Sequence, residues 1–579
     1  MSDDAQAKTG TKIGHSSKRI NSSGPRSDVP TLSSEMLERI QGYGSEEAVA
    51  AGTLLFSRGT RGTDFFVVLQ GMIELFEHRR NGGFNAMARL GKGQFTGELD
   101  VLSGREALLS CRAAKHSRIL RVGVEELRRL MRTELEIADL FVDAWIHRRA
   151  GLIEQAQGGV IVIGYGHDAG ATLTQQFLVR NGYPNKFVDA ENNPTAAALL
   201  AGLNLDPSET PIVFLPDHRI LRRPSISALA AELGMTTIFQ SEELFDVAIL
   251  GAGPSGLAAA VYAASEGLNT IVLESTAPGG QAGTSSRIEN YLGFPNGVSG
   301  QELASRAEIQ AQRFGAQFAI SRTVAGLQCK GSMQELLLTC GQVVLARTAV
   351  IATGARYRRL DVPDYERFEL RNIHYAATLV ESSRCLGQDV AVVGGGNSAG
   401  QAALHLSRSA AHVHLFVRGE ALHMTMSDYL LQRLGSCLRI TVHANTEIES
   451  IAGDERLRSV TARNRLTQER TSYAVTDIFV MIGADPNTDW LRGKLELDRN
   501  GFIKTGYLLS QESSPFATSC PGVFAIGDVR AGSIKRVAAA VGEGAAVISD
   551  VHRRLEALRS ESLEEGRCLA PVRALTHAS

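Results

Sequence analysis

Hydrophobic positions along the chain follow three different patterns, one after another. Residues 31–123 carry short stretches in which apolar and polar residues alternate between glycines, and residues 124–149 form a charged stretch of helical character. Residues 158–242 alternate strand-like and helix-like segments in the order β-α-β-α-β-β-α. From residue 244 onwards, continuous apolar runs lead into glycine-rich turns and then into helical patterns. Alternation is typical of antiparallel sheets, whereas apolar runs followed by helices are typical of parallel sheets.

These patterns predict a multidomain protein. We expect a β-roll at residues 31–150, a small α/β domain at 158–242, and a pair of parallel-sheet domains between residues 244 and 555. A chain of 579 residues is too long for one core, which agrees with three or four domains. Residues 1–30 are rich in Ser, Gly, Lys and Asp without an apolar run, so we expect a disordered tail there and a C-terminal tail at 556–579.

The charge balance narrows the class of partner. A net charge of −2 provides no basic field that would indicate nucleic-acid binding. One uncharged stretch, residues 247–264, approaches the length of a membrane span. Gly251, Gly253 and Pro254 interrupt that stretch, which therefore fits a strand, a turn and a helix better. We expect a cytoplasmic protein without a membrane span.

A dinucleotide-binding turn follows the first of these apolar runs. Residues 244–250 form a strand-like run, a helical pattern begins after the turn, and the next strand, 270–273, ends in Glu274. The first glycine would make the tight turn, the second would let the backbone approach a pyrophosphate, and the third would let helix and strand pack closely. Glu274 lies where a carboxylate can accept ribose hydroxyls. The turn itself reads Gly251-Ala252-Gly253-Pro254-Ser255-Gly256.

A second turn of the same kind follows residues 389–393. The next strand, residues 412–417, ends without an acid and meets Arg418. A carboxylate at that place would repel a 2′-phosphate, whereas an arginine can bind one. The sequence therefore favours NADPH over NADH at this second site, although Arg418 could also be a solvated surface charge. The turn contains Gly394, Gly395, Gly396, Asn397, Ser398 and Ala399.

Four further motifs, in this order, resemble those of thioredoxin reductases. One resembles the segment beside the flavin ring, one the strand that ends in A-T-G, one the closing motif whose Asp binds the flavin ribityl chain, and one the following turn toward the ring. Together with the two turns they cover about 300 residues. In the same order, the motifs contain Gly280, Gln281 and Asn290; Thr353 and Gly354; Gly527 and Asp528; and Arg536 and Val537.

The resemblance implies a Rossmann-like FAD domain at residues 244–361 and 489–555, into which an NADPH domain at 362–488 is inserted. It implies FAD and NADPH as cofactors and a homodimer as the assembly. Two adjacent nucleotide sites in one chain indicate hydride transfer between two bound cofactors.

The chain departs from that family where the family carries its redox-active C-x-x-C dithiol. Those two places hold Ala376 and Leu379, neither of which can form a thiolate. Members of the superfamily without the dithiol include ferredoxin and flavodoxin reductases. The neighbouring His374 and Tyr375 would lie near the flavin in one domain orientation, or could be a satisfied histidine and a packed tyrosine. Of the family's basic triplet for the 2′-phosphate only Arg418 stands, with Gly419 and His423 near the other two places.

The cysteines add no local redox or metal motif. No two of them are spaced C-x-x-C, so we expect no metal site and reduced, mostly buried thiols, although a distant pair could meet in space. The seven are Cys111, Cys329, Cys340, Cys385, Cys437, Cys520 and Cys568.

The N-terminal β-roll resembles a cyclic nucleotide-binding domain. Gly97 and Glu98 match the pair that opens the phosphate cassette of that family, whose Glu binds the ribose 2′-OH. The position of the phosphate-neutralising arginine holds Leu108, and a shorter cassette would bring in Arg105 or Arg112. The alternatives are a bound cyclic nucleotide, or a β-roll kept for packing, dimerisation or protein contacts.

The middle segment resembles a thioredoxin-like domain of the glutaredoxin type, including Pro211 before a strand, which we expect to be cis. The loop that carries cysteines in glutaredoxins falls at residues 165–169 and has none. We expect a scaffold or docking surface, with binding of glutathione or a thioredoxin-like partner as the alternative.

Three functions are compatible with these motifs. The first is an FAD-dependent NADPH oxidoreductase that passes electrons to a quinone, a ferredoxin or flavodoxin, oxygen or a thioredoxin-like protein, with the N-terminal domain as a candidate regulator. The second is a redox- or nucleotide-sensing protein without turnover. The third is a thioredoxin reductase that uses distant cysteines, of which Cys385 lies nearest to the lost motif.

Overall fold

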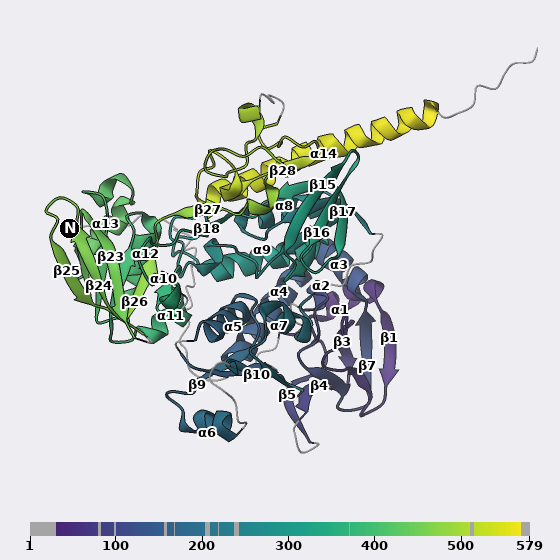
Figure 1. Cartoon of the computed structure of the whole chain (residues 1–579). Helices are drawn as coiled ribbons and strands as arrows, with labels where there is room; N and C mark the ends of the chain where they lie inside the picture. Colours follow the sequence, from purple (N-terminus) through teal and green to yellow (C-terminus); the bar gives the residue numbers. More distant parts are fainter. Residues whose placement is uncertain are drawn as a thin grey trace, which may run out of the picture.

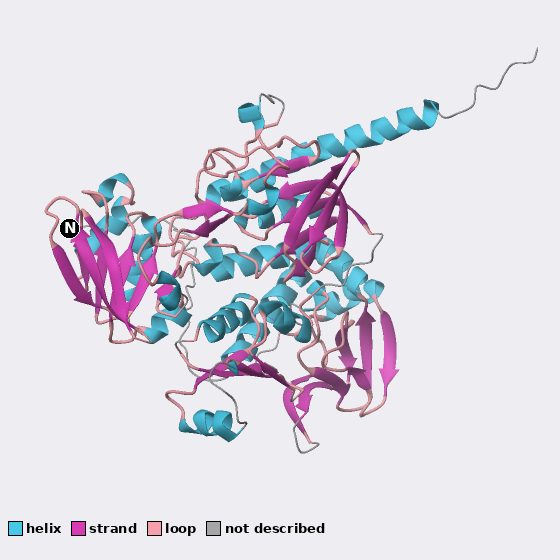
Figure 2. Ribbon diagram, in the orientation of Figure 1, coloured by secondary structure: helices cyan, strands magenta, loops and turns pink. Residues whose placement is uncertain are grey.

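The chain forms four bodies arranged around a central helix layer (Figure 1). The structure is a computed structural model that describes residues 30–568 except 79–82, 98–99, 156–158, 167, 203–208, 218, 237–242, 370, 455 and 510–513. Figure 2 shows that helices and strands are mixed throughout, apart from the strand-rich N-terminal body. Within the described ranges, none of the helices combines the length and the apolar character that a membrane crossing requires.

The N-terminal body is the predicted β-roll. Two sheets, with strand orders β1-β7-β3 and β2-β6-β4-β5, enclose an aromatic core in which the rings of Phe65 and Phe141 lie 4.8 Å apart. The predicted helical stretch is divided at Glu134 into two helices, and Trp145 of the second is fully buried. The elements are α1 (Ser34–Ile40), β1 (Ser45–Val49), β2 (Leu54–Phe56), β3 (Phe65–Gln70), β4 (Ile73–His78), β5 (Phe84–Leu90), α2 (Asp100–Ser103), β6 (Ser110–Ala113), β7 (Ser117–Val122), α3 (Val124–Thr133) and α4 (Leu135–Glu154).

The middle domain has the predicted order of elements. Its sheet has the strand order β11-β10-β8-β9, in which only β8 and β9 are parallel. The peptide bond between Thr210 and Pro211 is cis, which confirms that prediction. The elements are β8 (Val160–Gly164), α5 (Ala169–Arg180), β9 (Asn185–Asp189), α6 (Pro194–Gly202), β10 (Ile212–Phe214), β11 (Ile220–Arg222) and α7 (Ile226–Glu232).

The first Rossmann domain has a central parallel sheet. Strands β14, β13, β12, β17 and β28 are parallel, and the antiparallel pair β15–β16 extends the sheet beyond β17. Its strands are continuous apolar runs because both faces are buried, one against helices α8, α9 and α14 and the other against β15, β16 and residues 491–503. The elements are β12 (Leu244–Leu250), α8 (Pro254–Ser265), β13 (Thr270–Glu274), α9 (Gly300–Phe314), β14 (Gln317–Ile320), β15 (Val324–Lys330), β16 (Met333–Leu338), β17 (Val343–Ile351), β28 (Val523–Ala525) and α14 (Val537–Cys568).

The last helix differs from the sequence prediction. We expected a tail from residue 556, but α14 continues to Cys568 and extends away from the body of the chain (Figure 1). The buried Val551, Leu555 and Leu558 recur at helical spacing across the predicted boundary, which explains the continuation.

The second Rossmann domain is inserted into the first. Its five-stranded sheet, β19-β26-β20-β21-β22, is parallel throughout, and a three-stranded antiparallel sheet, β23-β24-β25, covers one side. The two connecting segments pair as a ribbon of β18 (Ala355–Tyr357) and β27 (Ala484–Pro486). The elements are α10 (Tyr365–Phe368), β19 (Ile373–His374), α11 (Leu379–Arg384), β20 (Asp389–Val393), α12 (Asn397–Leu406), β21 (His412–Phe416), α13 (Asp428–Gly435), β22 (Ile440–His443), β23 (Thr446–Gly453), β24 (Leu457–Asn464), β25 (Arg470–Ala474) and β26 (Asp477–Val480).

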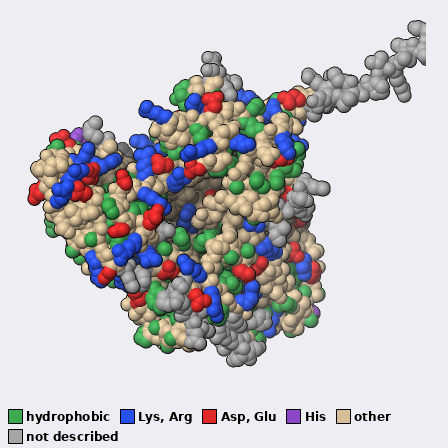
Figure 3. Space-filling model, viewed as in Figure 1, with side chains coloured by type: hydrophobic (Ala, Val, Ile, Leu, Met, Phe, Trp, Pro, Cys, Tyr) green, Lys and Arg blue, Asp and Glu red, His purple; other side chains and the backbone are tan. Residues whose placement is uncertain are grey.

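Helix α5 of the middle domain contacts both Rossmann domains. Toward the second, Gln176 Nε2 donates to Glu381 Oε1 at 2.6 Å, and Arg384 Nη1 donates to Thr172 Oγ1 at 2.7 Å. Toward the first, Arg180 and Asn181 at the end of α5 donate to backbone carbonyls. Figure 3 shows a hollow between the second Rossmann domain, at the left, and the rest of the chain, with Lys and Arg side chains around it.

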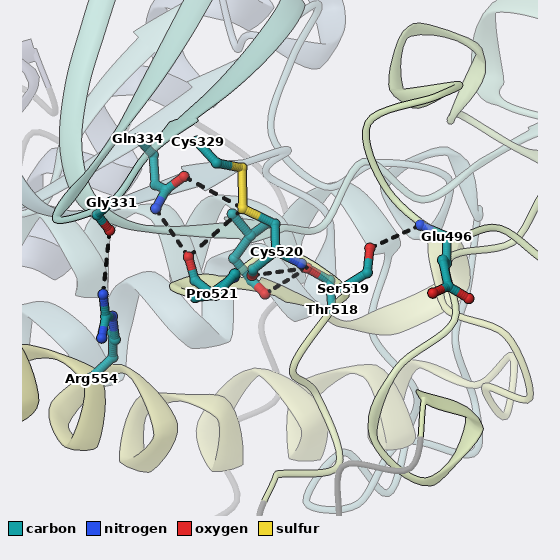
Figure 4. The surroundings of a disulfide bond; sticks show 10 residues. Cys329, Gly331, Gln334, Glu496, Thr518, Ser519, Cys520, Pro521 and Arg554 are labelled. Carbon is teal, nitrogen blue, oxygen red and sulfur yellow. Dashed lines mark hydrogen bonds between the residues drawn. A yellow bond between two sulfur atoms is a disulfide. The ribbon is translucent and has the colours of Figure 1, made fainter.

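Two of the cysteines correct the expectation of reduced thiols. Cys329 on β15 and Cys520, just before β28, form a disulfide across 191 positions (Figure 4). Gln334 Nε2 donates to the Pro521 carbonyl at 3.1 Å, which fixes the same two segments together. The prediction failed because the parallel pairing of β28 with β17 brings these segments together, and cysteine spacing contains no information on that pairing.

Candidate functional site

The turn after β12 has the geometry that the first glycine motif predicts. Gly251 has a φ of +104°, and a Cβ there would lie 2.4 Å from the Ala352 carbonyl oxygen. Its N–H donates to the Leu273 carbonyl at 2.8 Å. The turn therefore packs closely between the carboxyl ends of β13 and β17, and no residue larger than glycine fits at position 251.

The second glycine is different because packing does not require it. A Cβ on Gly253 would meet nothing nearer than Gly280 Cα, at 4.0 Å. Gly253 is the N-cap of α8, and no side chain caps that helix end. The start of α8 therefore presents N–H groups without a side-chain cap at a positive helix end, next to Gly280, which fits a dinucleotide pyrophosphate.

Glu274 has a task that the sequence did not reveal. Its Oε2 accepts from the Ala252 N–H at 2.8 Å, and its Oε1 accepts from the Thr276 and Ala277 N–H groups at 2.9 and 3.3 Å. The carboxylate therefore ties the glycine turn to the loop after β13. If Glu274 also accepts from ribose hydroxyls, as the sequence predicts, its two oxygens would accept from those hydroxyls and from the backbone N–H groups together.

The flavin-type motifs gather around the start of α8. A Cβ on Gly527 would lie 2.5 Å from Ser255 Oγ, so the closing motif contacts the first turn directly. Gln281 Nε2 donates to the Ala355 carbonyl. Thr353 is fixed by Asn487, whose Nδ2 donates to the Thr353 carbonyl at 2.9 Å. These segments come from four separate stretches of sequence and surround one site.

Asp528 belongs to the closing motif and is half-buried beside these segments. Burial raises the pKa of its carboxyl, and the nearby Glu543 acts in the same direction, whereas Lys535 opposes them. A half-buried carboxyl with a raised pKa has lost hydrating water that its protein neighbours do not fully replace. Hydroxyl groups of a ligand could supply the missing hydrogen bonds. The other predicted flavin-site residues are placed as follows. The turns around the start of α8 include Pro254, Gly256 and Gly354, helix α14 begins at Val537, and the exposed residues are Asn290 and Arg536.

The second glycine turn repeats the design. Gly394 has a φ of +146°, and a Cβ there would lie 2.3 Å from the Met481 carbonyl oxygen. Gly396 is the N-cap of α12, again without a side-chain cap, and a Cβ there would have no neighbour closer than 3.9 Å. Asn397 Oδ1 accepts from the Ser427 N–H at 2.8 Å, while Ser398 is exposed and Ala399 buried.

Arg418 is exposed at the end of β21, and a second arginine lies beside it. Arg465 Nη1 donates to the Arg418 carbonyl at 3.3 Å, and Arg465 Nε lies 3.8 Å from Glu447 Oε2, so the Arg465 guanidinium lies beside the backbone of Arg418. The sequence analysis missed Arg465, because it lies in the turn between β24 and β25 and reaches Arg418 only through the fold.

The lost dithiol positions lie between β19 and α11. Ala376 is half-buried, and Leu379 begins α11, with its side chain outside the described part of the structure. Cys385 at the end of α11 is fully buried, and its thiol donates to the Glu381 carbonyl at 3.3 Å. Burial raises the pKa of the Cys385 thiol, and the neighbouring Asp477 raises it further, so a thiolate is disfavoured.

His374 and Tyr375 are satisfied inside the protein. His374 Nε2 and Asp477 Oδ1 lie 2.8 Å apart, and both side chains are buried. The Tyr375 hydroxyl accepts from the Tyr365 hydroxyl at 2.9 Å and donates to Glu369. These contacts agree with the structural interpretation of both residues.

The candidate cyclic-nucleotide residues that the structure describes have partners within the chain. Gly97 has a φ of +93° and packs against Trp145, and Glu98 lies outside the described residues. Arg105 pairs with Glu308 of α9 at 3.3 Å, and Arg112 pairs with Glu74 at 2.6 Å. Both candidate arginines are therefore engaged by carboxylates of the chain itself.

Comparison with known proteins agrees with these sites. The family model for cyclic nucleotide-binding domains matches residues 46–134. A thioredoxin reductase of Mycolicibacterium smegmatis is 35% identical over 315 residues, which are 54% of this chain and 98% of the relative. An NADH dehydrogenase of Bacillus subtilis is 32% identical over 56% of this chain and 62% of its own length.

A solved structure shows the same architecture. The crystal structure of Lactococcus lactis thioredoxin reductase in its FR conformation matches with a TM-score of 0.50 and 30% identity, covering 54% of this chain and 98% of that one. The family model for pyridine nucleotide-disulphide oxidoreductases matches residues 245–544, more than half of the chain. The chain therefore belongs to the pyridine nucleotide-disulphide oxidoreductases, as a thioredoxin reductase-like, FAD-dependent NAD(P)H oxidoreductase with a cyclic nucleotide-binding-like domain at its N-terminal side.

Proposed function

We propose that this enzyme takes electrons from NADPH and delivers them to an acceptor without using a dithiol of its own beside the flavin. The observation that carries the proposal is that both glycine turns have their ligand-accepting geometry, while the dithiol positions hold Ala376 and Leu379. Bound FAD would accept a hydride from the nicotinamide and release electrons to the acceptor. The chain would bind, orient and shield the two cofactors.

The states of Cys385 and of the Cys329–Cys520 pair support a non-thiol outlet. Cys385 is buried with a raised thiol pKa, which opposes nucleophilic attack on a disulfide. The Cys329–Cys520 disulfide precedes β28, whereas the flavin-type motif at Gly527 follows it. The disulfide and that motif therefore lie at opposite ends of one strand.

The acceptor belongs to one of four classes: a quinone, a ferredoxin or flavodoxin, oxygen, or a thioredoxin-like protein. The similarity to a Bacillus subtilis protein named NADH dehydrogenase supports acceptors other than thioredoxin. Arg418 and Arg465 support NADPH as the donor, because two guanidinium groups favour a 2′-phosphate. A homodimer and a cytoplasmic location are proposed on the family resemblance.

The N-terminal domains are proposed as regulators because they contact the first Rossmann domain directly. Arg313 of α9 donates from Nε and Nη2 to the Met131 carbonyl of α3, at 3.0 and 2.7 Å, and Arg105 pairs with Glu308 of the same helix. A ligand that bound the β-roll could therefore act on α9, which packs on α8 of the flavin site.

Anaerobic stopped-flow mixing with NADPH and with NADH tests the proposal. We expect rapid bleaching of the flavin, faster with NADPH, and recovery of the yellow colour on addition of one of the four acceptor classes. Bound FAD that neither nucleotide bleaches would replace this proposal with a sensing protein that does not turn over. Recovery only by a thioredoxin-like protein, lost on Cys329→Ser, would indicate a thioredoxin reductase that uses distant cysteines.

A further inference from the structure

A cavity of about 440 Å³ lies between the middle domain and the first Rossmann domain. One wall comes from α5, with Gln176, Phe177 and Arg180, and the other includes Ser275, Thr276 and Ser321. Ser275 and Thr276 directly follow Glu274 at the end of β13, and Ser321 directly follows β14. The cavity thus lies at the carboxyl ends of the parallel strands, where α/β sheets bind their ligands.

Arg180 crosses from the middle domain to the flavin-type loop. Its Nη2 donates to the carbonyls of Gly280 and Ala277, at 3.1 and 3.3 Å. Gly280 packs against Gly253 at the start of α8, where a Cβ on Gly280 would lie 3.0 Å from Gly253 Cα. The Arg180 guanidinium therefore contacts the residue that packs against Gly253, where the pyrophosphate is expected.

The partners of Arg180 leave its charge incompletely compensated. Its Nε is buried and has no hydrogen-bond partner among the residues that the structure describes. Burial lowers the pKa of this guanidinium, and Glu274 and Tyr357 oppose the shift. Glu274 already accepts from three backbone N–H groups, and Arg180 Nη2 donates to the neutral carbonyls of Ala277 and Gly280. A buried cation in that position favours an additional anionic partner.

We propose that Arg180 binds the adenosine diphosphate half of FAD, and that the middle domain forms the second wall of that pocket. The helix N-terminus at Gly253 would hold one side of the pyrophosphate, and the Arg180 guanidinium would neutralise it from the other. The ribose would lie near Glu274 and the adenine in the cavity beyond it. The flavin site of this chain then includes a residue from outside both Rossmann domains.

The middle domain thereby has a role that needs no cysteine. Asn181 Nδ2 donates to the Thr276 carbonyl at 3.1 Å, and Gln301 Nε2 donates to the Arg180 carbonyl at 2.7 Å, so the end of α5 is docked from both sides. A domain that completes a cofactor pocket needs its docking surface, but it needs no cysteine in the loop at residues 165–169. The inference does not depend on which acceptor the enzyme uses.

The rate of FAD release from the full-length holoprotein tests the role of Arg180. Arg180→Met keeps the length of the side chain and removes the charge, and Arg180→Gln also keeps a donor for the Gly280 carbonyl. We expect both variants to release FAD about tenfold faster than the parent on dilution, followed by the rise of free-flavin fluorescence, because a charge-assisted contact is lost. We expect Arg180→Lys to lie between them and the parent.

Asn181→Ala is the matched control, because Asn181 holds the same loop but carries no charge and does not line the cavity. We expect its FAD release to stay within about twofold of the parent. Equal acceleration by Asn181→Ala and Arg180→Gln would show that docking, and not the charge, retains FAD, and would overturn the proposal. Unchanged release in Arg180→Gln would overturn it as well and would leave the cavity to a separate nucleotide.

Discussion

Arg105 of the β-roll pairs with Glu308 of α9 at 3.3 Å, across the interface between the first and third bodies of the chain. Both side chains are largely buried, with exposed fractions of 15% and 16%. Arg105 Nη1 also donates to the Asn181 carbonyl at 3.4 Å, so one arginine joins the β-roll, the middle domain and the first Rossmann domain. The arginine closest to a phosphate-binding place in the sequence is thus an interdomain residue in the structure.

Replacing either partner of this pair should destabilise the interface. We expect Arg105→Ala to lower the free energy of unfolding by about 1–3 kcal/mol, because Glu308 stays largely buried without this cation. The double variant Arg105→Ala/Glu308→Ala should be less destabilised than the sum of the single variants. Strict additivity in chemical denaturation would show that the two side chains are not coupled.

The Arg105–Glu308 pair should also affect the affinity of the β-roll for a cyclic nucleotide. If the β-roll binds one through Arg105, Glu308 competes with its phosphate, and Glu308→Gln should tighten binding of a fluorescent cyclic nucleotide by about tenfold. Arg118→Ala serves as a control, because Arg118 is exposed and pairs with Glu46 within the β-roll. Failure of both the parent and Glu308→Gln to bind would assign the β-roll to packing and protein contacts.

Gly253 should be needed for FAD and not for folding. A Cβ there would meet only Gly280 Cα, at 4.0 Å, whereas the neighbouring Gly251 has no room. We expect Gly253→Val to fold with a normal circular dichroism spectrum and to purify colourless, because its side chain would occupy the pyrophosphate position. Gly42→Ala is a control at an equally open glycine of the β-roll. A yellow Gly253→Val protein would contradict this assignment.

The two arginines of the second site should distinguish NADPH from NADH. We expect Arg418→Ala and Arg465→Ala each to raise KM for NADPH by about tenfold and to leave KM for NADH nearly unchanged, because only NADPH carries the 2′-phosphate. Arg458→Ala, an exposed arginine elsewhere on β24, should change neither value. Equal changes for both nucleotides would remove the arginine concerned from the phosphate site.

The elements that could be predicted from sequence are those with local causes. The glycine turns at Gly251 and Gly394 follow from strand, glycine and helix patterns within about twenty residues, whereas the cis bond before Pro211 was expected from the resemblance of the middle segment to glutaredoxins. Arg180, Arg465 and the Cys329–Cys520 pair could not be predicted, because each meets its partner only after distant segments pack. Arg180 ends an ordinary helix, and nothing in its neighbours indicates a contact with Gly280.

We expect the Asp528 carboxylate to lower the stability of the FAD-free chain and to increase its affinity for FAD. The pKa of its carboxyl is raised in the folded chain, so the folded state favours the protonated form, and ionisation as the pH rises through that pKa costs stability. We expect Asp528→Asn to melt higher than the parent at neutral pH in the FAD-free state, with the difference shrinking as the pH falls. Its affinity for FAD should decrease if Asp528 accepts from the ribityl hydroxyls. A lower melting temperature at neutral pH would contradict the first expectation.

The disulfide should contribute to stability and leave electron transfer intact. Cys329 and Cys520 close a loop of 191 positions, and we expect Cys329→Ser/Cys520→Ser to lose about 2–4 kcal/mol, because the unfolded chain gains freedom. Bleaching of the flavin by NADPH and transfer to a non-thiol acceptor should keep their rates, since the disulfide and the flavin-type motif lie at opposite ends of β28. Cys385→Ser is the parallel control for the buried thiol and should also leave both rates unchanged. A loss of acceptor reduction in the Cys329→Ser/Cys520→Ser protein, with normal bleaching, would instead make this disulfide the route by which electrons leave the enzyme.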